Sequence, residues 1–248
     1  MKSVFKTDKG KVRFHNEDSG GVFPHSRRLL AVVADGMGGH RAGDVASQMA
    51  IKFIQEKWED VEGLQEQNDD GKWLNDVILA ANKHLFNHSN QNEECRGMGT
   101  TIVAAICQKD VFVIGHVGDS RIYFLPAEGD FLQVTEDHTL VNEFVKSGQL
   151  SKEDAELHPQ KHVIMRALGT EQDIEVDTKT IKWARGAKIL LCSDGLSNKL
   201  SDEELNSILS SGQTLDEQAS LMIEKANAAG GDDNITVTII ENTDGDDS

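Results

Sequence analysis

Short runs of apolar and β-branched residues, each bounded by Gly, Asp or Ser, predict the β-strands of this chain. The runs are residues 29–34, 101–107, 111–117, 121–125, 188–192 and 235–240. Several lack regular polar alternation, so we expect these strands to be buried on both faces. The runs between 101 and 134 follow one another after short turns. This spacing favours antiparallel hairpins over helical crossovers.

Apolar residues at helical spacing predict helices between these strands. One stripe comprises Ala46, Ala50, Phe53, Ile54 and Trp58, and a second comprises Trp73, Val77, Ala80 and Ala81. Near the C-terminus, the pairs Ser201/Glu204 and Thr214/Glu217 have the spacing of capping boxes, so each pair predicts a helix start. The pattern as a whole indicates one α+β domain with central strands and helices outside.

Composition then narrows the class of protein. The chain has 248 residues and a formal net charge of −17, which argues against nucleic acid and anionic membranes as partners. Its three cysteines, Cys95, Cys107 and Cys192, form no close pair, so a disulfide scaffold or a cysteine zinc site is not expected. No apolar run is long enough for a membrane span or a signal core. We therefore expect a cytoplasmic protein.

Two stretches have the composition of loose chain. Residues 59–70 are rich in acidic and amide side chains, and residues 242–248 form a short acidic tail. We accordingly expect a single catalytic domain over residues 1–241, followed by this tail.

Aspartates recur at the ends of the predicted strands. Three strands run into Asp35-Gly36, Asp119-Ser120 and Asp194-Gly195, and Asp233 directly precedes the strand at 235–240. A single Asp at such a place is usually a turn residue. In an antiparallel sheet, however, the exit of one strand lies beside the entrance of its neighbour, so Asp233 is expected next to Asp194 or Asp35.

Four such carboxylates held close together would repel one another unless a cation lies between them. Carboxylate oxygens select hard cations, Mg²⁺ or Mn²⁺, over zinc. The 12-residue acidic loop of a calcium EF-hand is absent from the sequence. The acids therefore predict a magnesium or manganese site.

An arginine precedes two further acids near the N-terminus. Arg13 lies four and five residues before Glu17 and Asp18. Alone, this spacing fits either a surface salt bridge or a guanidinium that binds phosphate beside a metal cluster.

Together these motifs resemble the compact bacterial form of the metal-dependent serine/threonine protein phosphatases, the PPM or type 2C family. The resemblance rests on eight segments in the family's order: RFHNED (13–18), ADGMGGH (34–40), GMGTT (97–101), GDSR (118–121), TEDHT (135–139), ALGT (167–170), SDG (193–195) and GDDNIT (231–236). It implies a central β-sandwich of two antiparallel sheets flanked on both sides by helices, in four αββα layers. It also implies a binuclear Mn²⁺ or Mg²⁺ site that activates a water for hydrolysis.

The resemblance also implies roles for individual residues. Asp35 would bridge both metals, with the Gly36 carbonyl as a further ligand, and Asp194 and Asp233 would complete one metal. Glu17 and Asp18 would hold metal-bound waters, Asp119 would share a third, weaker ion with Asp194, and Arg13 would bind the phosphate. Many eukaryotic members of the family place a histidine directly after the Asp-Gly pair as a candidate proton donor, whereas this chain has Met37 there and His40 three residues later. His40 or a metal-bound water is then the expected general acid.

The resemblance places a flap beside the active site at about residues 146–168, and we hypothesise that it helps to select the protein substrate. The expected function is hydrolysis of phosphoserine and phosphothreonine in proteins, opposite a serine/threonine kinase of the same cell, by a monomer. A hydrolase of small phosphate esters is the alternative within enzymes. An inactive binding or regulatory family member is a further alternative, against which the retained Asp35, Asp194 and Asp233 argue.

Overall fold

The structure, a computed structural model, describes residues 1–38, 42–61 and 69–243. Its strands are β1 (Lys2–Asp8), β2 (Asp18–His25), β3 (Arg28–Met37), β4 (Gly99–Thr100), β5 (Ile102–Cys107), β6 (Val111–Val117), β7 (Arg121–Leu125), β8 (Leu132–Gln133), β9 (Asp177–Lys182), β10 (Lys188–Cys192) and β11 (Ile235–Glu241). Its α-helices are α1 (Ala42–Glu59), α2 (Asp69–Gln91), α3 (Leu140–Lys146), α4 (Lys152–Leu157), α5 (Asp194–Ser197), α6 (Asp202–Leu209) and α7 (Leu215–Ala228), and a 3₁₀ turn spans Glu93–Cys95.

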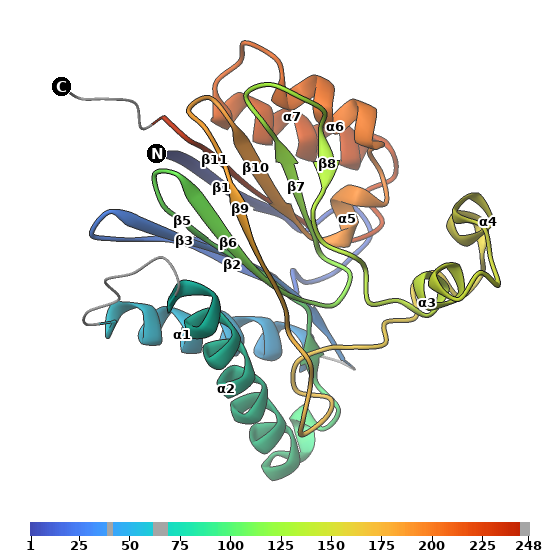
Figure 1. Ribbon diagram of the computed structural model, residues 1–248. Helices are drawn as coiled ribbons and strands as arrows, with labels where there is room; N and C mark the ends of the chain where they lie inside the picture. The colour runs from blue at the N-terminus through green and yellow to red at the C-terminus, as the bar shows by residue number, and fades with distance from the viewer. Residues whose placement is uncertain (39–41, 62–68, 244–248) are drawn as a thin grey trace.

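The strands form two antiparallel sheets that face each other. One sheet has the order β1-β11-β10-β7-β8, and the other has the order β2-β3-β5-β6-β9. Helices α1 and α2 cover the outer face of the second sheet, and α6 and α7 cover the outer face of the first (Figure 1). The predicted α+β fold, a four-layer sandwich, is confirmed. Within the described ranges, no helix has both the length and the apolar character needed to cross a bilayer.

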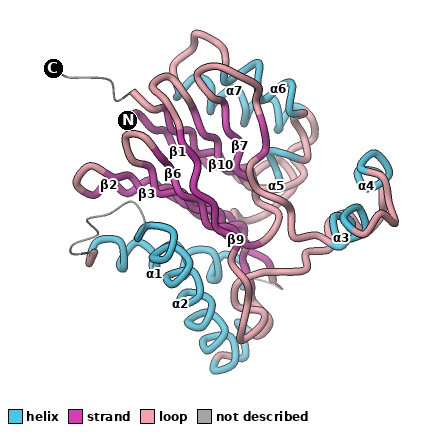
Figure 2. The backbone as a smooth tube through the Cα atoms, viewed as in Figure 1, coloured by secondary structure: helices cyan, strands magenta, loops and turns pink. Residues whose placement is uncertain are grey.

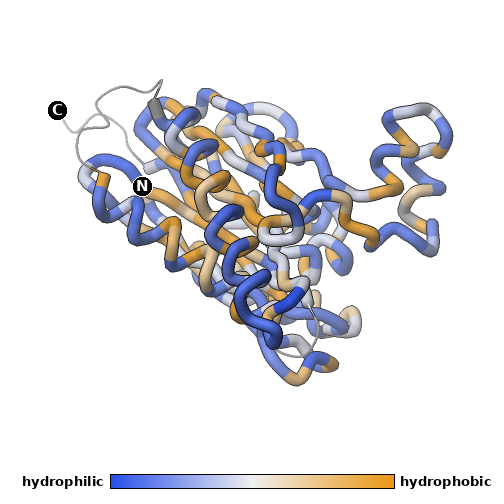
Figure 3. Tube along the Cα trace, turned by 90° about the horizontal axis from the view of Figure 1, so that it is seen from below, coloured by the Kyte–Doolittle hydropathy of each residue, from blue (hydrophilic) through white to orange (hydrophobic). Residues whose placement is uncertain are grey.

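Strand β3 shows how one apolar run serves two cores. Leu30, Val32 and Ala34 point to the core beneath α1 and α2. The alternate residues Leu29, Ala31 and Val33 point to the core between the two sheets. Figure 3 shows hydrophilic and hydrophobic positions alternating along the two helices in front, with mostly hydrophobic strands behind them. Because β3 is buried on both faces, its sequence is a continuous hydrophobic run.

The capping boxes and the apolar stripes locate the helices as predicted. Ser201 accepts a hydrogen bond from the Glu204 N–H and starts α6, and Thr214 does the same with Glu217 at the start of α7. The two predicted stripes lie in α1 and α2.

The sequence pattern missed β1, β2, β4 and β9. Strand β9 lies at a sheet edge and exposes five of its six residues, with only Ile181 half-buried. Its sequence therefore contains no apolar run. Strand β2 contains Gly20, Gly21 and Pro24, which weaken any strand prediction.

The prediction of successive hairpins between 101 and 134 holds for β5–β6 and β7–β8 but is wrong for β6–β7. Strand β6 pairs with β5 and β9, whereas β7 pairs with β10 and β8 in the other sheet. The turn between them therefore crosses from one sheet to the other at Gly118, whose φ is +110°. A Cβ on Gly118 would lie 2.7 Å from the Thr101 side chain, so only glycine fits this crossing. The crossing places Asp119 at the end of the sandwich, between the sheets.

The two stretches predicted as loose are partly built into the fold. Residues 62–68 and 244–248 lie outside the described part of the chain. Asp70, in contrast, is fully buried in α2 and makes a 2.9 Å ion pair with Arg28. Asn242, the first residue of the predicted tail, is buried and its N–H donates to the Ala187 carbonyl. Asn242 thus packs as part of the domain that was predicted to end at residue 241.

A segment containing α3 and α4 projects from the body of the molecule (Figure 2). Its two ends meet where Thr139 pairs with Ile164 and the Leu140 N–H donates to the Val163 carbonyl. We call residues 140–163 the projecting segment. It begins six residues before the start of the predicted flap and ends five residues before the end of that flap. Ala167 and Leu168, which the prediction included, are buried in the body, where Leu168 bridges Thr100.

Candidate active site

Five of the predicted acids come from strand ends at one end of the sandwich. Asp18 opens β2 and lies directly opposite Asp35 of β3 in the antiparallel register. Asp194 follows β10, and Asp233 precedes the neighbouring strand β11, so the two are adjacent, as predicted from the antiparallel geometry. Asp119 reaches the same end through the crossing turn after β6. Besides burial, the charges of neighbouring acids of this set raise the pKa values of Asp18, Asp35 and Asp119, so the structure gathers the five acids into one group. We call Asp18, Asp35, Asp119, Asp194 and Asp233 the acid cluster.

The backbone of Asp35 is held by two threonines of the GMGTT segment. The Asp35 N–H donates to Thr101 Oγ1 at 3.0 Å, and its carbonyl accepts from the Thr100 hydroxyl and the Thr101 N–H, both at 2.9 Å. Desolvation, followed by the charges of Asp18 and Asp194, raises the pKa of Asp35 well above its ordinary value. Asp35 is thus rigidly placed among like charges.

Asp18 is buried and has one satisfied oxygen. The Ser193 hydroxyl donates to Asp18 Oδ2 at 2.6 Å, while Oδ1 has no hydrogen-bond partner within the described part of the chain. Burial raises the pKa of Asp18 to about 7, because it outweighs the stabilising hydrogen bond from Ser193.

Asp119 and Asp194 share this pattern. Each has an Oδ1 that is buried and unpartnered among the described residues. Burial, with the charge of Asp194 next, raises the pKa of Asp119 to about 8. Burial and the charge of Asp233 raise the pKa of Asp194, although its carboxyl also lies within hydrogen-bonding reach of Asp35. Asn198 supports Asp194 by donating to its Oδ2 at 3.0 Å.

The loop that carries Arg13 is fixed by Asn234. The Asn234 side-chain amide donates to the carbonyls of Lys9 and His15, and its Oδ1 accepts the Glu17 N–H at 2.7 Å. This arrangement brings Arg13 to the cluster, where its guanidinium contacts Asp233 Oδ2 at 2.8 Å while its side chain stays 49% exposed. Desolvation lowers the pKa of Arg13, but Asp233, Glu17 and Asp35 together raise it more, so the guanidinium stays charged.

Glu17 and Gly36 lie beside the first turn of α1. The Gly36 N–H donates to the Glu17 carbonyl at 3.1 Å, and a Cβ on Gly36 would lie 2.0 Å from the Gly43 carbonyl oxygen. Burial raises the pKa of Glu17, although the charge of Arg13 lowers it. The charge of Asp44 also acts on Glu17, and Asp44 Oδ1 has no hydrogen-bond partner in the described ranges. Asp44 is thus an acid of this site that the sequence patterns did not single out.

Two histidines bear on the question of a proton donor. His40 lies outside the described residues, whereas Met37 is placed at the end of β3. His162, in the projecting segment, is exposed and close enough for its charge to lower the pKa of Asp194. No sequence pattern predicts the proximity of His162 to Asp194, because this proximity depends on the path of the projecting segment.

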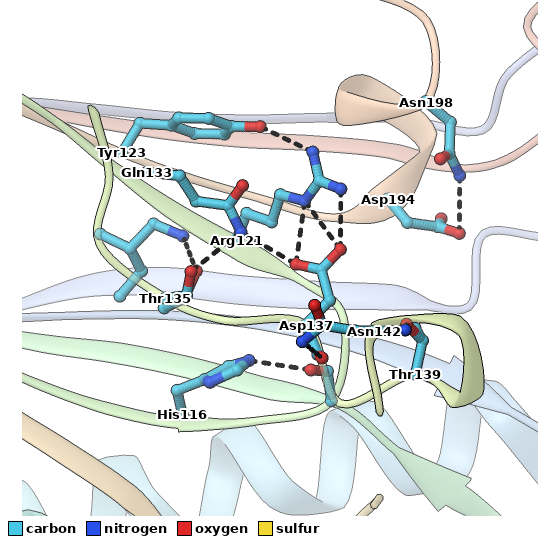
Figure 4. Close-up of polar contacts among 12 residues, drawn as sticks. His116, Arg121, Tyr123, Gln133, Thr135, Asp137, Thr139, Asn142, Asp194 and Asn198 are labelled. Carbon is cyan, nitrogen blue, oxygen red and sulfur yellow. Dashed lines mark hydrogen bonds and ion pairs between the residues drawn. The ribbon is translucent and has the colours of Figure 1, made fainter. Parts of the chain in front are cut away.

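Arg121 and Asp137 fix the loop beside Asp119. The Arg121 guanidinium makes a bidentate ion pair with Asp137, with Nη2 to Oδ2 at 2.7 Å, and donates to the Tyr123 hydroxyl at 3.0 Å (Figure 4). Gln133 donates to Asp137 Oδ1, and Asn142 donates to the Asp137 carbonyl. Arg121 belongs to the GDSR segment and Asp137 to the TEDHT segment, and the sequence patterns assign neither of these two residues a role. Their role here is to hold the loop that starts the projecting segment.

The acid cluster fits divalent cations. Three of its acids bury an unpartnered carboxylate oxygen, and desolvated charges without a partner are strongly destabilising. Its donors are all carboxylates, with the Gly36 carbonyl nearby, and such oxygen sets suit Mn²⁺ and Mg²⁺. The fold and these side chains define a class of protein, namely metal-dependent enzymes that act on phosphate esters.

Comparison with known proteins identifies the family within this class. The sequence profile described as "Protein phosphatase 2C" matches residues 11–228, and the chain belongs to this family. A relative named "Serine/threonine phosphatase stp", from Listeria innocua serovar 6a, is 46% identical over 243 residues, which are 97% of this chain and 96% of the relative.

Solved structures agree with this assignment. The serine/threonine phosphatase Stp1 from Staphylococcus aureus has a TM-score of 0.91 at 34% identity and covers 98% of this chain and 95% of its own. The catalytic domain of the serine threonine protein phosphatase PstP, in complex with 2 manganese ions, has a TM-score of 0.84 at 34% identity, with 98% of each chain covered.

Proposed function

We propose that the acid cluster is the site where this chain hydrolyses phosphoserine and phosphothreonine in proteins. That the chain is a metal-dependent serine/threonine protein phosphatase follows from its family and its relatives. The observation that carries the assignment to this site is the convergence of five carboxylates from strand ends, three of them with a buried unpartnered oxygen, next to an exposed arginine.

Each residue of the cluster has a role in this proposal. Asp35 and the Gly36 carbonyl would hold two cations together, and Asp194 and Asp233 would be the further ligands of one of them. Glu17 and Asp18 would hold waters bound to the cations. When bound, two Mn²⁺ or Mg²⁺ ions offset the charge of the cluster and activate a water for attack on phosphorus. Asp119, shared with Asp194, is proposed to hold a third, weaker ion.

Arg13 binds the phosphate of the substrate. Its guanidinium presents several N–H donors in a planar fork that matches phosphate oxygens, and its exposed position leaves donors available beside Asp233. These hydrogen bonds orient the ester for in-line attack and stabilise the equatorial oxygens. Protonation of the leaving oxygen falls to His40 or to a water at the cluster, since Met37 has no proton to donate.

The substrates and setting of the enzyme complete the proposal. Residues 1–241 form one catalytic domain that acts as a monomer in the cytoplasm. Phosphorylated proteins are its substrates, a serine/threonine kinase of the same cell is its counterpart, and the projecting segment contributes to the choice between protein substrates.

One experiment tests the proposed function directly. A phosphothreonine peptide and a small aryl phosphate are each incubated with the protein in Mn²⁺, in Mg²⁺ and in a chelator. We expect phosphate release that depends on the metal, with kcat/KM higher for the peptide. A higher kcat/KM for the aryl phosphate would support the small-ester alternative, and no release with either substrate would support an inactive family member.

A further inference from the structure

Two buried histidines lie directly behind Asp119, outside the acid cluster. His116 is near the end of β6, and His138 is in the loop between β8 and α3; they are 1% and 2% exposed. Their rings are 4.4 Å apart. Asp177 opens β9 and lies opposite His116 in the strand register, so these three side chains meet at one point. The proposed function assigns none of them a role.

Both histidines hold Gly118, the residue before Asp119. The Gly118 carbonyl accepts a hydrogen bond from the His116 ring at Nε2 (2.9 Å) and one from the backbone N–H of His138 (2.8 Å). The Gly118 N–H donates to His138 Nδ1 at 3.1 Å. Gly118 also has the positive φ that only glycine tolerates here. Its polar backbone groups are thus satisfied by the two histidines in a conformation that sets the direction of Asp119.

These hydrogen bonds assign the protons on both rings. His138 Nδ1 accepts, so its proton is on Nε2, which donates to Asp177 Oδ2 at 3.3 Å. His116 donates from Nε2, and its Nδ1 has no hydrogen-bond partner within the described residues. Burial lowers the pKa of His138, and burial with the neighbouring His138 lowers the pKa of His116 to about 4, so both rings are neutral near pH 7.

The same three residues could also be considered as metal ligands, because their ligand atoms lie within 4.8 Å of one another. The hydrogen bonds argue against this reading. A metal-bound histidine normally donates its second ring N–H to an acceptor. To bind a cation through Nε2, His138 would carry its proton on Nδ1, which faces the Gly118 N–H, and two donors would then oppose each other. The arrangement is suited to holding Gly118 rather than a cation.

We propose that His116 and His138 are positioning residues that fix the Gly118–Asp119 turn so that Asp119 faces Asp194. The proposal rests on the proposed function, in which Asp119 and Asp194 share the weakest cation. His138 also ties the turn to the projecting segment, since its carbonyl accepts the Met165 N–H at 2.7 Å just after that segment ends. His138 therefore holds the Asp119 turn through its side chain and the base of the projecting segment through its backbone.

Two substitutions at His138 separate its two hydrogen bonds. In His138→Asn, the amide oxygen takes the place of Nδ1 and can accept the Gly118 N–H, but the bond to Asp177 is lost. In His138→Gln, the longer amide reaches towards Asp177, but the acceptor for Gly118 is lost. Asp119→Asn serves as the reference that removes the carboxylate itself, and His88→Gln, at a half-buried position in α2, serves as the matched control.

The experiment measures bound Mn²⁺ by electron paramagnetic resonance titration, with thermal unfolding recorded for each variant. We expect His138→Gln to weaken the binding of the Mn²⁺ ion that depends on Asp119 about tenfold, which is the scale of one lost hydrogen bond at a buried site. His138→Asn and His88→Gln should stay within about threefold of the unsubstituted protein. Equal losses in His138→Asn and His138→Gln, or none in either, would overturn the proposal.

Two further readouts keep the inference distinct from the proposed function. Nitrogen-15 spectra of the unsubstituted protein should show protonated Nε2 on both histidines, and a proton on Nδ1 of His138 would overturn the proposal. If the unsubstituted protein neither hydrolyses the phosphopeptide nor binds Mn²⁺, the proposed function fails together with this inference. If it does both and His138→Gln behaves as the unsubstituted protein does, the inference alone fails.

Discussion

The guanidinium of Arg13 and the carboxylate of Asp233 form a 2.8 Å ion pair between residues 220 positions apart. The pair closes the N-terminal loop onto the segment that precedes β11, where the Lys11 and Val12 N–H groups also donate to the Gly231 carbonyl. The sequence left Arg13 open to two interpretations, a surface salt bridge or a phosphate ligand. The structure shows an ion pair with an acid of the cluster, so Arg13 lies beside the site where the proposed function requires a phosphate ligand.

Replacing Arg13 with alanine should lower kcat/KM for a phosphopeptide by about 10- to 100-fold, because a charged hydrogen bond to phosphate is lost. The free energy of unfolding should change little, since the ion pair is largely exposed. Steady-state kinetics and urea unfolding measure the two effects. Arg185→Ala, in the exposed turn before β10 at the opposite end of the sandwich, is the matched control. An unchanged kcat/KM in Arg13→Ala would leave Arg13 as a surface ion pair.

Asparagine in place of Asp35 should reduce metal-dependent turnover at least about 1,000-fold, because the substitution removes the charge that would bridge two cations. The fold should persist, since the Asp35 backbone is held by Thr100 and Thr101 independently of its side chain. Phosphopeptide hydrolysis across a Mn²⁺ titration, with circular dichroism, makes the comparison. Asp110→Asn, in the β5–β6 turn at the far end of the sheet, controls for the loss of one negative charge. Turnover near that of the control would contradict the bridging role.

The parts of the site that the sequence predicted are those encoded locally. Asp35, Asp194 and Asp233 adjoin apolar runs that are buried strands, so both their position and their mutual proximity follow from strand periodicity and antiparallel pairing. The proximity of Asp119 to the cluster depends on a crossing between sheets at Gly118, where the sequence favoured a hairpin. A short turn in the sequence predicts that the chain changes direction, but it does not predict which sheet the next strand joins.

Other contacts could not be predicted because they join segments with no shared pattern. His116 and His138 meet only because β6 and the loop after β8 pack at the same end of the sandwich. Asn234 holds a loop more than 200 positions earlier in the chain. The polar edge strands β1 and β9 carry no apolar run, because an edge gains more from charged side chains that prevent aggregation.

In the presence of a chelator, the free energy of unfolding should fall as pH rises from about 4 to about 8. Asp18 and Asp119 have folded pKa values of about 7 and about 8, above the ordinary value of an aspartate, so the folded state binds more protons in this window. The stability that they contribute is present at the acidic end and is lost as each deprotonates. Each unit of pKa shift corresponds to about 1.4 kcal/mol, so each of the two acids lowers the stability by about 1.4 kcal/mol per pH unit between its ordinary pKa and its folded pKa.

Urea unfolding at pH 5, 6.5 and 8.5 in a chelator measures this slope. Asp18→Asn should flatten it, because the substitution removes a group that takes up a proton on folding, while Ser193 can still donate to the amide oxygen. When saturating Mn²⁺ replaces the chelator, the free energy of unfolding should instead rise with pH, since the ion binds the deprotonated carboxylates. A stability that rises with pH in the chelator would contradict the pKa directions assigned to these two acids.

Removing the projecting segment should change activity towards phosphoproteins far more than activity towards a small aryl phosphate. Because Thr139 and Ile164 are paired, a short Gly-Ser turn can join them in place of residues 140–163 without moving the body of the molecule. The segment exposes Leu157 and Val163, which are 86% and 40% accessible and offer apolar contacts to a protein substrate. We expect kcat/KM for a phosphoprotein to fall about tenfold, with less than about a threefold change for the aryl phosphate. Leu157→Ser, which leaves the backbone intact, should show the same selective loss at smaller size. Equal effects on both substrates would mean that the segment supports the acid cluster rather than selecting the substrate.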